Sequence, residues 1–253
     1  MKKIFAVAIL SWMGFTACKK ALEQPGDFSS VAVIQASPVS ITSPTDTLNV
    51  FVDNMKYNSS GIIYNTNSTY LPVLAGTKTI DIRRAMITNT ANYVSSFSHT
   101  FEKGMAYSFF VYDTTTASSG QARILRLNDN LTLPAAGNSH VRFLHLAPTG
   151  AAVDVTLIRT SVTPNDSVTI SNRTFVGSSP NEATLSAFTP IPRGVYTARV
   201  KTAGTQTVLA TSTATLLTAA ATGASLSEGR IVTLYATGTA KGRPLAIGAF
   251  RHY

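Results

Sequence analysis

The feature that most constrains the fold is a set of short segments with alternating apolar residues, which runs through the chain twice. The gaps between these segments are rich in Gly, Pro, Asn and Ser, which are typical of turns. Strands at this spacing predict antiparallel sandwiches, and no stretch beyond residue 30 has a helical pattern of useful length. The first series comprises residues 31–36, 48–53, 77–83, 106–112 and 122–127, and the second comprises residues 141–146, 153–158, 195–201, 208–216 and 231–235.

The two series also match each other in sequence. Each repeat has about 105–115 residues, the size of one immunoglobulin-like sandwich. We therefore expect an all-β protein of two tandem immunoglobulin-like antiparallel β-sandwiches, in residues 31–133 and 139–253, with the boundary in residues 128–139. Four blocks align in the same order: 31–38 with 141–148, 48–52 with 153–157, 74–83 with 192–201, and 101–104 with 226–229.

Composition agrees with a β-rich fold. The chain has 25 Ser and 35 Thr among its 253 residues but only four Glu, whereas exposed helix faces are usually filled by Glu, Lys, Gln and Arg. With 44% hydrophobic residues it has enough apolar material to form a core, which excludes a charge-rich disordered chain.

The N-terminus has the pattern of an export signal. A short positive region is followed by the apolar run Ile4–Phe15, which as a helix would span roughly 18 Å, too short for a hydrocarbon core of roughly 30 Å. We therefore expect a signal peptide in residues 1–17. The run ends in Phe-Thr-Ala-Cys18, which resembles the bacterial lipobox and implies lipidation of Cys18, followed by a lipidated tether in residues 18–30. The alternative is an ordinary signal peptide with an incidental cysteine.

Lipidation would place the protein in the cell envelope. Two or three acyl chains would anchor it to the outer membrane effectively permanently. The leaflet stays open between the periplasmic and the surface one, although Lys19 and Lys20 favour the periplasmic leaflet weakly.

Three further blocks resemble a known family. They are Val-x-Phe-Leu-His-x-x-Pro in residues 141–148, Val-Asp-Val in residues 153–155, and Leu-Pro-Ala-Ala-Gly in residues 133–137. These blocks resemble the domain of unknown function 4397 (DUF4397) family, and the similarity covers roughly residues 30–253. The resemblance implies tandem immunoglobulin-like repeats in a secreted or lipid-anchored bacterial protein, and it supplies no catalytic residues.

One histidine and one carboxylate offer the best candidate for chemistry. His145 and Asp154 lie on consecutive expected strands, and a histidine held by a carboxylate is the orienting half of a catalytic triad. The equivalent positions of the first repeat hold Gln35 and Asn49, which form hydrogen bonds but do not titrate. We therefore expect two structural polar pairs, His145 with Asp154 and Gln35 with Asn49, and no catalytic residue.

No cofactor or metal is expected. The chain lacks the common nucleophile and phosphate-binding motifs, and no pair among its four histidines has the spacing of a zinc site. No stretch clusters several carboxylates as a calcium site would.

The net charge of +9 bears on partners. The basic residues are scattered rather than gathered in a stripe, so we expect no nucleic acid, and an acidic polysaccharide or anionic lipid fits better. Four tyrosines among Asn and Ser in the first repeat either stack on sugar rings or pack structurally: Tyr57, Tyr64, Tyr70 and Tyr93.

Three triplets resemble sites of bacterial O-glycosylation, in which Asp precedes Ser or Thr and then an aliphatic residue or Thr. They predict modification at Thr47, Thr114 and Ser167, although such triplets also arise by chance in a chain so rich in Ser and Thr.

Together these patterns predict a non-catalytic, lipid-anchored envelope protein that presents a binding or structural surface, for a glycan or another envelope protein. One alternative is a carbohydrate-active or other hydrolase with a site of dispersed carboxylates, for which Asp53, Asp81 and Asp154 are the candidates on expected strands. A purely architectural subunit of an envelope assembly is the other alternative.

Overall fold

The computed structural model describes residues 27–37, 47–84, 93–113, 122–148, 151–212, 229–239 and 243–252. These residues contain sixteen strands and one short helix. None of their helices is both long and apolar enough to cross a membrane.

The first repeat holds β1 (Phe28–Gln35), β2 (Leu48–Val52), β3 (Met55–Lys56), β4 (Leu71–Leu74), β5 (Gly76–Arg84), β6 (Tyr93–Phe101), β7 (Ala106–Tyr112) and β8 (Arg123–Asp129). The second holds β9 (Asn138–His145), β10 (Val153–Arg159), β11 (Asp166–Arg173), α1 (Glu182–Leu185), β12 (Thr189–Pro192), β13 (Tyr196–Thr202), β14 (Val208–Thr211), β15 (Ile231–Thr237) and β16 (Ala246–Arg251).

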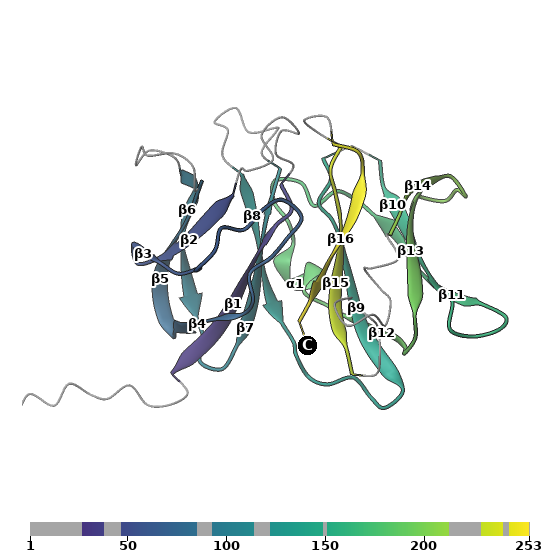
Figure 1. The fold of residues 1–253 in the computed structure, drawn as a ribbon, viewed down its shortest axis with the longest axis horizontal. Coiled ribbons are helices and arrows are strands. Elements are labelled where there is room, and N and C mark those ends of the chain that lie inside the picture. Colours follow the sequence, from purple (N-terminus) through teal and green to yellow (C-terminus); the bar gives the residue numbers. More distant parts are fainter. Residues whose placement is uncertain are drawn as a thin grey trace, which may run out of the picture.

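The strands form four sheets of four strands each. In the first repeat, inner sheet 1 has the order β4-β1-β7-β8 and outer sheet 1 the order β3-β2-β5-β6. In the second repeat, inner sheet 2 has the order β12-β9-β15-β16 and outer sheet 2 the order β11-β10-β13-β14. The second pair of orders is the first pair moved eight strands along the chain, so the all-β sandwich prediction is confirmed. Figure 1 shows the two inner sheets side by side in the middle of the molecule.

The aligned sequence blocks occupy the same register in both sandwiches. Val31 pairs with Tyr107 in inner sheet 1, and its equivalent Val141 pairs with Val232 in inner sheet 2. Both pairs are parallel, which departs from the purely antiparallel sandwiches expected. A parallel pair needs a long crossover, and the chain makes it by passing through the outer sheet between β1 and β7.

Three apolar cores hold the layers together. One core lies between the two sheets of each sandwich. The third, which we call the interface core, lies between the two inner sheets, so each inner sheet is buried on both faces: Val31 and Val33 face the first sandwich core, whereas Ala32 and Ile34 face the interface core. The buried residues of the interface core are Ala32, Ile34, Ala36, Phe110, Tyr112, Leu125, Leu127, Leu144, Leu146, Tyr235 and Phe250.

Several elements were not predicted. The first strand begins at Phe28, within the segment expected to be tether. β6 was missed although Phe97, His99 and Phe101 alternate with Ser98 and Thr100, and β3, β4 and β12 are too short to give a clear pattern. β11, α1 and β16 were also missed.

The expected boundary falls between β8 and β9, which end and begin at Asp129 and Asn138. That each half folds independently stays a prediction. The interface core gives the two halves a large shared apolar contact.

Candidate functional site

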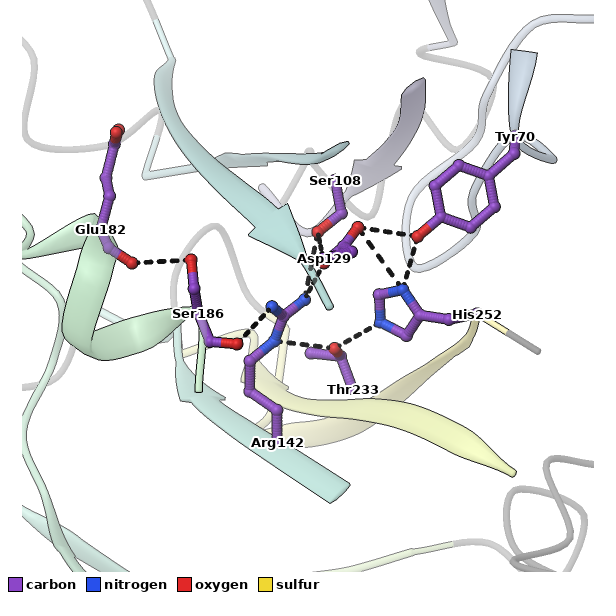
Figure 2. A network of polar contacts seen from close by, with 8 residues as sticks. All are labelled: Tyr70, Ser108, Asp129, Arg142, Glu182, Ser186, Thr233 and His252. Atoms are coloured by element: carbon purple, nitrogen blue, oxygen red, sulfur yellow. Dashed lines mark hydrogen bonds and ion pairs between the residues drawn. The ribbon is translucent and has the colours of Figure 1, made fainter. Parts of the chain in front are cut away.

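The most concentrated group of polar side chains in the described residues is buried where the two sandwiches meet (Figure 2). It lies at one end of the interface core, on the facing sides of the inner sheets. We call it the interface network. The first sandwich contributes Tyr70, Ser108 and Asp129, and the second contributes Arg142, Thr233 and His252.

An ion pair joins the two halves of the network. Nη2 of Arg142 lies 2.9 Å from Oδ1 of Asp129, and the two side chains are 2% and 0% exposed. Ser108 donates to the same carboxylate oxygen at 3.0 Å and accepts from Arg142 at 3.1 Å. The guanidinium carbon lies 4.5 Å from the centre of the Phe188 ring, and Nη1 donates to the Ser186 carbonyl at 3.2 Å. The buried charge of Arg142 is therefore compensated by an ion pair, by hydrogen bonds and by an aromatic ring, as burial requires.

The remaining contacts close a ring with one consistent arrangement of protons. Nε of Arg142 donates to Thr233 Oγ1 at 3.0 Å, so the Thr233 hydroxyl is free to donate to Nε2 of His252 at 2.7 Å. Nδ1–H of His252 then donates to the Tyr70 hydroxyl at 2.6 Å, and that hydroxyl donates to Oδ2 of Asp129 at 2.7 Å. The network therefore assigns a neutral His252 protonated on Nδ1.

The pKa shifts agree with this assignment. Burial, as the largest cause, lowers the pKa of His252, although Asp129 beside it acts in the opposite direction. Burial alone would raise the pKa of Asp129, but the charge of Arg142 and the hydrogen bond from Tyr70 act against it, and the pKa of Asp129 is lowered overall. Burial, followed by the charge of Asp129, raises the pKa of Tyr70 far above its ordinary value. These directions favour a protonated Tyr70, an ionised Asp129 and a neutral His252 near neutral pH.

The network joins the two sandwiches and is closed to solvent. The side chains of Asp129 and His252 are both 0% exposed, so neither contacts solvent. Each donor and acceptor in the ring is used by another member of the ring. The geometry therefore fits a polar clamp between the two repeats.

The predicted pair of His145 with Asp154 does not form. His145 lies on inner sheet 2, where its Nε2 is 3.3 Å from the Ala151 carbonyl. Asp154 lies on outer sheet 2, where its two carboxylate oxygens accept from the backbone N–H groups of Asn172 and Gly204, both at 2.8 Å. The prediction was wrong because β9 and β10, although consecutive in the chain, belong to opposite sheets of the sandwich.

The second predicted pair is separated in the same way. Oε1 of Gln35 accepts from the backbone N–H of Ser37 at 3.4 Å, whereas Oδ1 of Asn49 accepts from the Asn58 amide at 3.4 Å. Gln35 is on inner sheet 1 and Asn49 on outer sheet 1.

The candidate modification sites are only partly within the described residues. Cys18 and Thr114 lie outside them. Thr47 is half-buried just before β2, and Ser167 is exposed on β11 at the edge of outer sheet 2. Lipidation and glycosylation therefore stay predictions.

Two of the four clustered tyrosines take part in the interface between the sandwiches. Besides Tyr70, Tyr64 reaches Thr237 at 3.3 Å and lies under the Arg243 guanidinium. Tyr57 is bonded to the Pro72 carbonyl within its own sandwich. These three tyrosines have structural contacts, as the packing interpretation predicts. The side chain of Tyr93 is outside the described residues.

The carboxylates considered for a hydrolase each have local partners. Asp53 pairs with Lys78 at 3.1 Å, and Asp81 pairs with Arg83 at 2.7 Å. Both are in the first repeat, whereas Asp154 is on the outer sheet of the second. Across the described residues, no three His, Cys, Asp or Glu side chains gather as metal ligands would.

His99 lies in an aromatic cage rather than in a polar site. The ring centres of Phe101, Tyr107 and Phe109 lie 4.7, 4.9 and 5.1 Å from its own. Burial is the largest cause that lowers its pKa. Its Nε2 is buried without a hydrogen-bond partner within the described part of the chain.

Two clefts open where the sandwiches meet, one on either side of α1. The polar cleft, of about 620 Å³, lies between β8 and residues 178–182. The second cleft, of about 550 Å³, lies between residues 104–106, 128–132 and 183–187. Clefts at domain interfaces are the usual places for ligands.

Sequence reasoning missed the interface network, although one signal was visible. Arg142 interrupts the apolar run of residues 141–146, and a charge inside a strand buried on both faces needs a buried partner. The partner could not be identified, because Asp129 comes from the other repeat.

Comparisons with known proteins give a family but no activity. No curated protein matches the chain. One solved structure that resembles it, a leucine-rich repeat protein from Bacteroides thetaiotaomicron VPI-5482, has 14% sequence identity and a TM-score of 0.22 over 74% of this chain. The chain spans about a quarter of that structure's length, with 24% covered, and the likeness carries no argument about fold or function.

A family model described as "Domain of unknown function (DUF4397)" matches residues 29–156. The match runs from the second residue of β1 into β10, so it includes nearly all of the first sandwich and, in the second, β9 and the first four residues of β10. Because it covers just over half of the chain, the protein belongs to the DUF4397 family.

Proposed function

We propose that the protein is a non-catalytic, lipid-anchored component of the cell envelope that presents a binding or structural surface. The interface network carries this proposal. Arg142, Asp129 and His252 are the kinds of groups that enzymes place in open sites, yet here they are buried, satisfied by one another and used to join two sandwiches. This use of the three groups favours a binding or structural role over a catalytic one.

The N-terminal pattern supports the location. Cys18 after a short apolar run would become the lipidated first residue, and the folded body begins with β1 at Phe28. The separate local partners of Asp53, Asp81 and Asp154 leave no observation that favours the hydrolase alternative.

Replacing the lipidated cysteine tests the anchor. We expect Cys18→Ala to abolish incorporation of labelled palmitate and to remove the protein from the outer-membrane fraction. Ala17→Gly is the matched control, because it keeps a small residue before the cysteine and should leave labelling unchanged. Normal processing and membrane retention of Cys18→Ala would contradict the proposal.

A further inference from the structure

The polar cleft contains a carboxylate site that is already occupied by the chain's own carboxylate. Glu182 Oε1 lies 3.1 Å from Nε of Arg126 and 3.4 Å from the backbone N of the same residue. A guanidinium and a backbone N–H directed at one oxygen are the donors that proteins use to bind carboxylates. The backbone donor is open because β8 is the edge strand of inner sheet 1.

The internal carboxylate is placed so that a ligand can replace it. The side chains of Arg126 and Glu182 are 38% and 36% exposed, and ion pairs at that exposure exchange readily with other charged groups. Glu182 lies in the first turn of a four-residue helix that has no fully buried residue, so its side chain can turn into solvent without opening the core. Arg126 is on a strand that has a buried neighbour on each side.

The rest of the cleft lining is rich in groups that bind hydroxyls. Ser178, Ser179 and Asn181 line the side opposite β8, and Arg123 lines the β8 side, held there by the buried Asp113 at 3.4 Å. Because α1 packs against β8, only a short part of the strand edge is open. A peptide would need a longer open edge to pair as an added strand.

We propose that the polar cleft binds an acidic saccharide, whose uronic acid carboxylate replaces Glu182 on Arg126 while the serines and Asn181 contact its hydroxyls. The proposal rests on the proposed function and names the ligand class of its binding surface. Glu182 then acts as an internal competitor for the site.

Two opposite substitutions test the proposal. Binding of galacturonate oligosaccharides to the full chain in detergent would be measured by calorimetry, with neutral galactose oligosaccharides of equal length for comparison. We expect Arg126→Gln to weaken binding of the acidic ligand by about tenfold or more, because the charge-assisted hydrogen bond from the guanidinium is lost and only the backbone N–H remains. We expect Glu182→Gln to strengthen it several-fold, because the competing charge is removed.

The matched control is a surface ion pair outside the cleft. Arg159 pairs with Asp166 on outer sheet 2, so Arg159→Gln should leave the affinity unchanged. Melting temperatures of all variants would show that each remains folded.

Four results would overturn the proposal: equal binding of the neutral oligosaccharide, unchanged affinity in Arg126→Gln, weaker binding in Glu182→Gln, or preferred binding of a peptide with a free C-terminal carboxylate. Each concerns the cleft alone. Normal processing and membrane retention of Cys18→Ala would instead count against the anchor, so failure of the cleft and failure of the envelope function are distinguishable.

Discussion

The inner and outer sheets of this protein are built from the same repeat but meet different surroundings. In β1 of inner sheet 1 the last five residues are all buried, whereas β2 of outer sheet 1 alternates between buried and half-buried positions. The strands of a sheet that is covered on both faces have continuous apolar sequences, whereas the strands of a sheet with one solvent-exposed face alternate between apolar and polar residues. The sequence pattern of each strand therefore indicates which layer it joins.

Polar residues follow the same division. On the inner sheets the charge of Arg142 is paired inside the interface network, with 2% of its side chain exposed. On outer sheet 1, Lys78 pairs with Asp53 at the surface, where their side chains are 22% and 49% exposed. The inner pair should therefore matter much more for stability than the outer one.

Breaking the inner pair should give the largest effect. We expect Arg142→Ala to lower the free energy of unfolding by about 3–5 kcal/mol, because Asp129 would remain buried without its charge partner. Urea unfolding measures this, and Lys78→Ala on the outer sheet, which should change little, is the matched control. Similar losses in both variants would remove the distinction between the layers.

Crowding the contact between the inner sheets should give the next largest effect. A Cβ at Gly248 would lie 2.2 Å from the Tyr235 ring and 2.4 Å from the Asn65 side chain. We expect Gly248→Ala to cost about 1–3 kcal/mol through overpacking, measured by thermal unfolding. Gly194→Ala is the comparison outside the interface, because its Cβ would meet the side chains of Arg159 and Ser161 near the surface, where they can shift towards solvent. An unchanged melting temperature in Gly248→Ala would mean that the sandwiches separate easily.

Acid should lower the stability of the folded protein through its buried histidines. Burial is the main cause that lowers the pKa of His99, His145 and His252. In the unfolded chain their pKa returns to about 6.5, so below that pH the unfolded state binds protons that the folded state does not. Stability should be fully present above pH about 6.5 and fall as the pH drops below it.

Urea midpoints at several pH values test this dependence. His99→Phe, which keeps an aromatic ring in the cage, should reduce the slope of stability between neutral and mildly acid pH. A midpoint that does not change over this range would contradict the expectation.

The smallest effect concerns the pair that does not form. Because His145 and Asp154 have separate partners on opposite sheets, His145→Gln and Asp154→Asn should act independently. A double-mutant cycle by urea unfolding should give a coupling indistinguishable from zero. A clear coupling would place the two side chains in contact.

Much of the fold could be predicted from the sequence. The blocks beginning at Val31 and Val141 align correctly because the same alternation and the same turn residues recur in both repeats. The contact between the sandwiches was missed, although residues 106–112 and 231–235 are apolar on both sides of the strand. That pattern indicates a second buried face.

The candidate site was harder to predict than the fold. Pairing His145 with Asp154 assumed that two consecutive strands lie in one sheet, whereas the chain crosses from inner sheet 2 to outer sheet 2 between β9 and β10. The interface network joins Tyr70 to His252 and Asp129 to Arg142, and no local pattern encodes which repeat supplies the partner. The exchange of Glu182 on Arg126 depends on a cleft that exists only after both repeats are folded.

The parallel pair of each inner sheet has a mechanical consequence. Under the proposed anchoring, a pull on the tether enters the folded body at Phe28 and runs along β1. This strand is bonded on one side to β4 and on the other, over residues 30–35, to the parallel strand β7. Force along the strand axis loads these hydrogen bonds together in shear, because they lie across the strand rather than in line with it. A protein attached by this end would therefore withstand more tension than a hairpin pulled apart at its open end, where the hydrogen bonds break one after another.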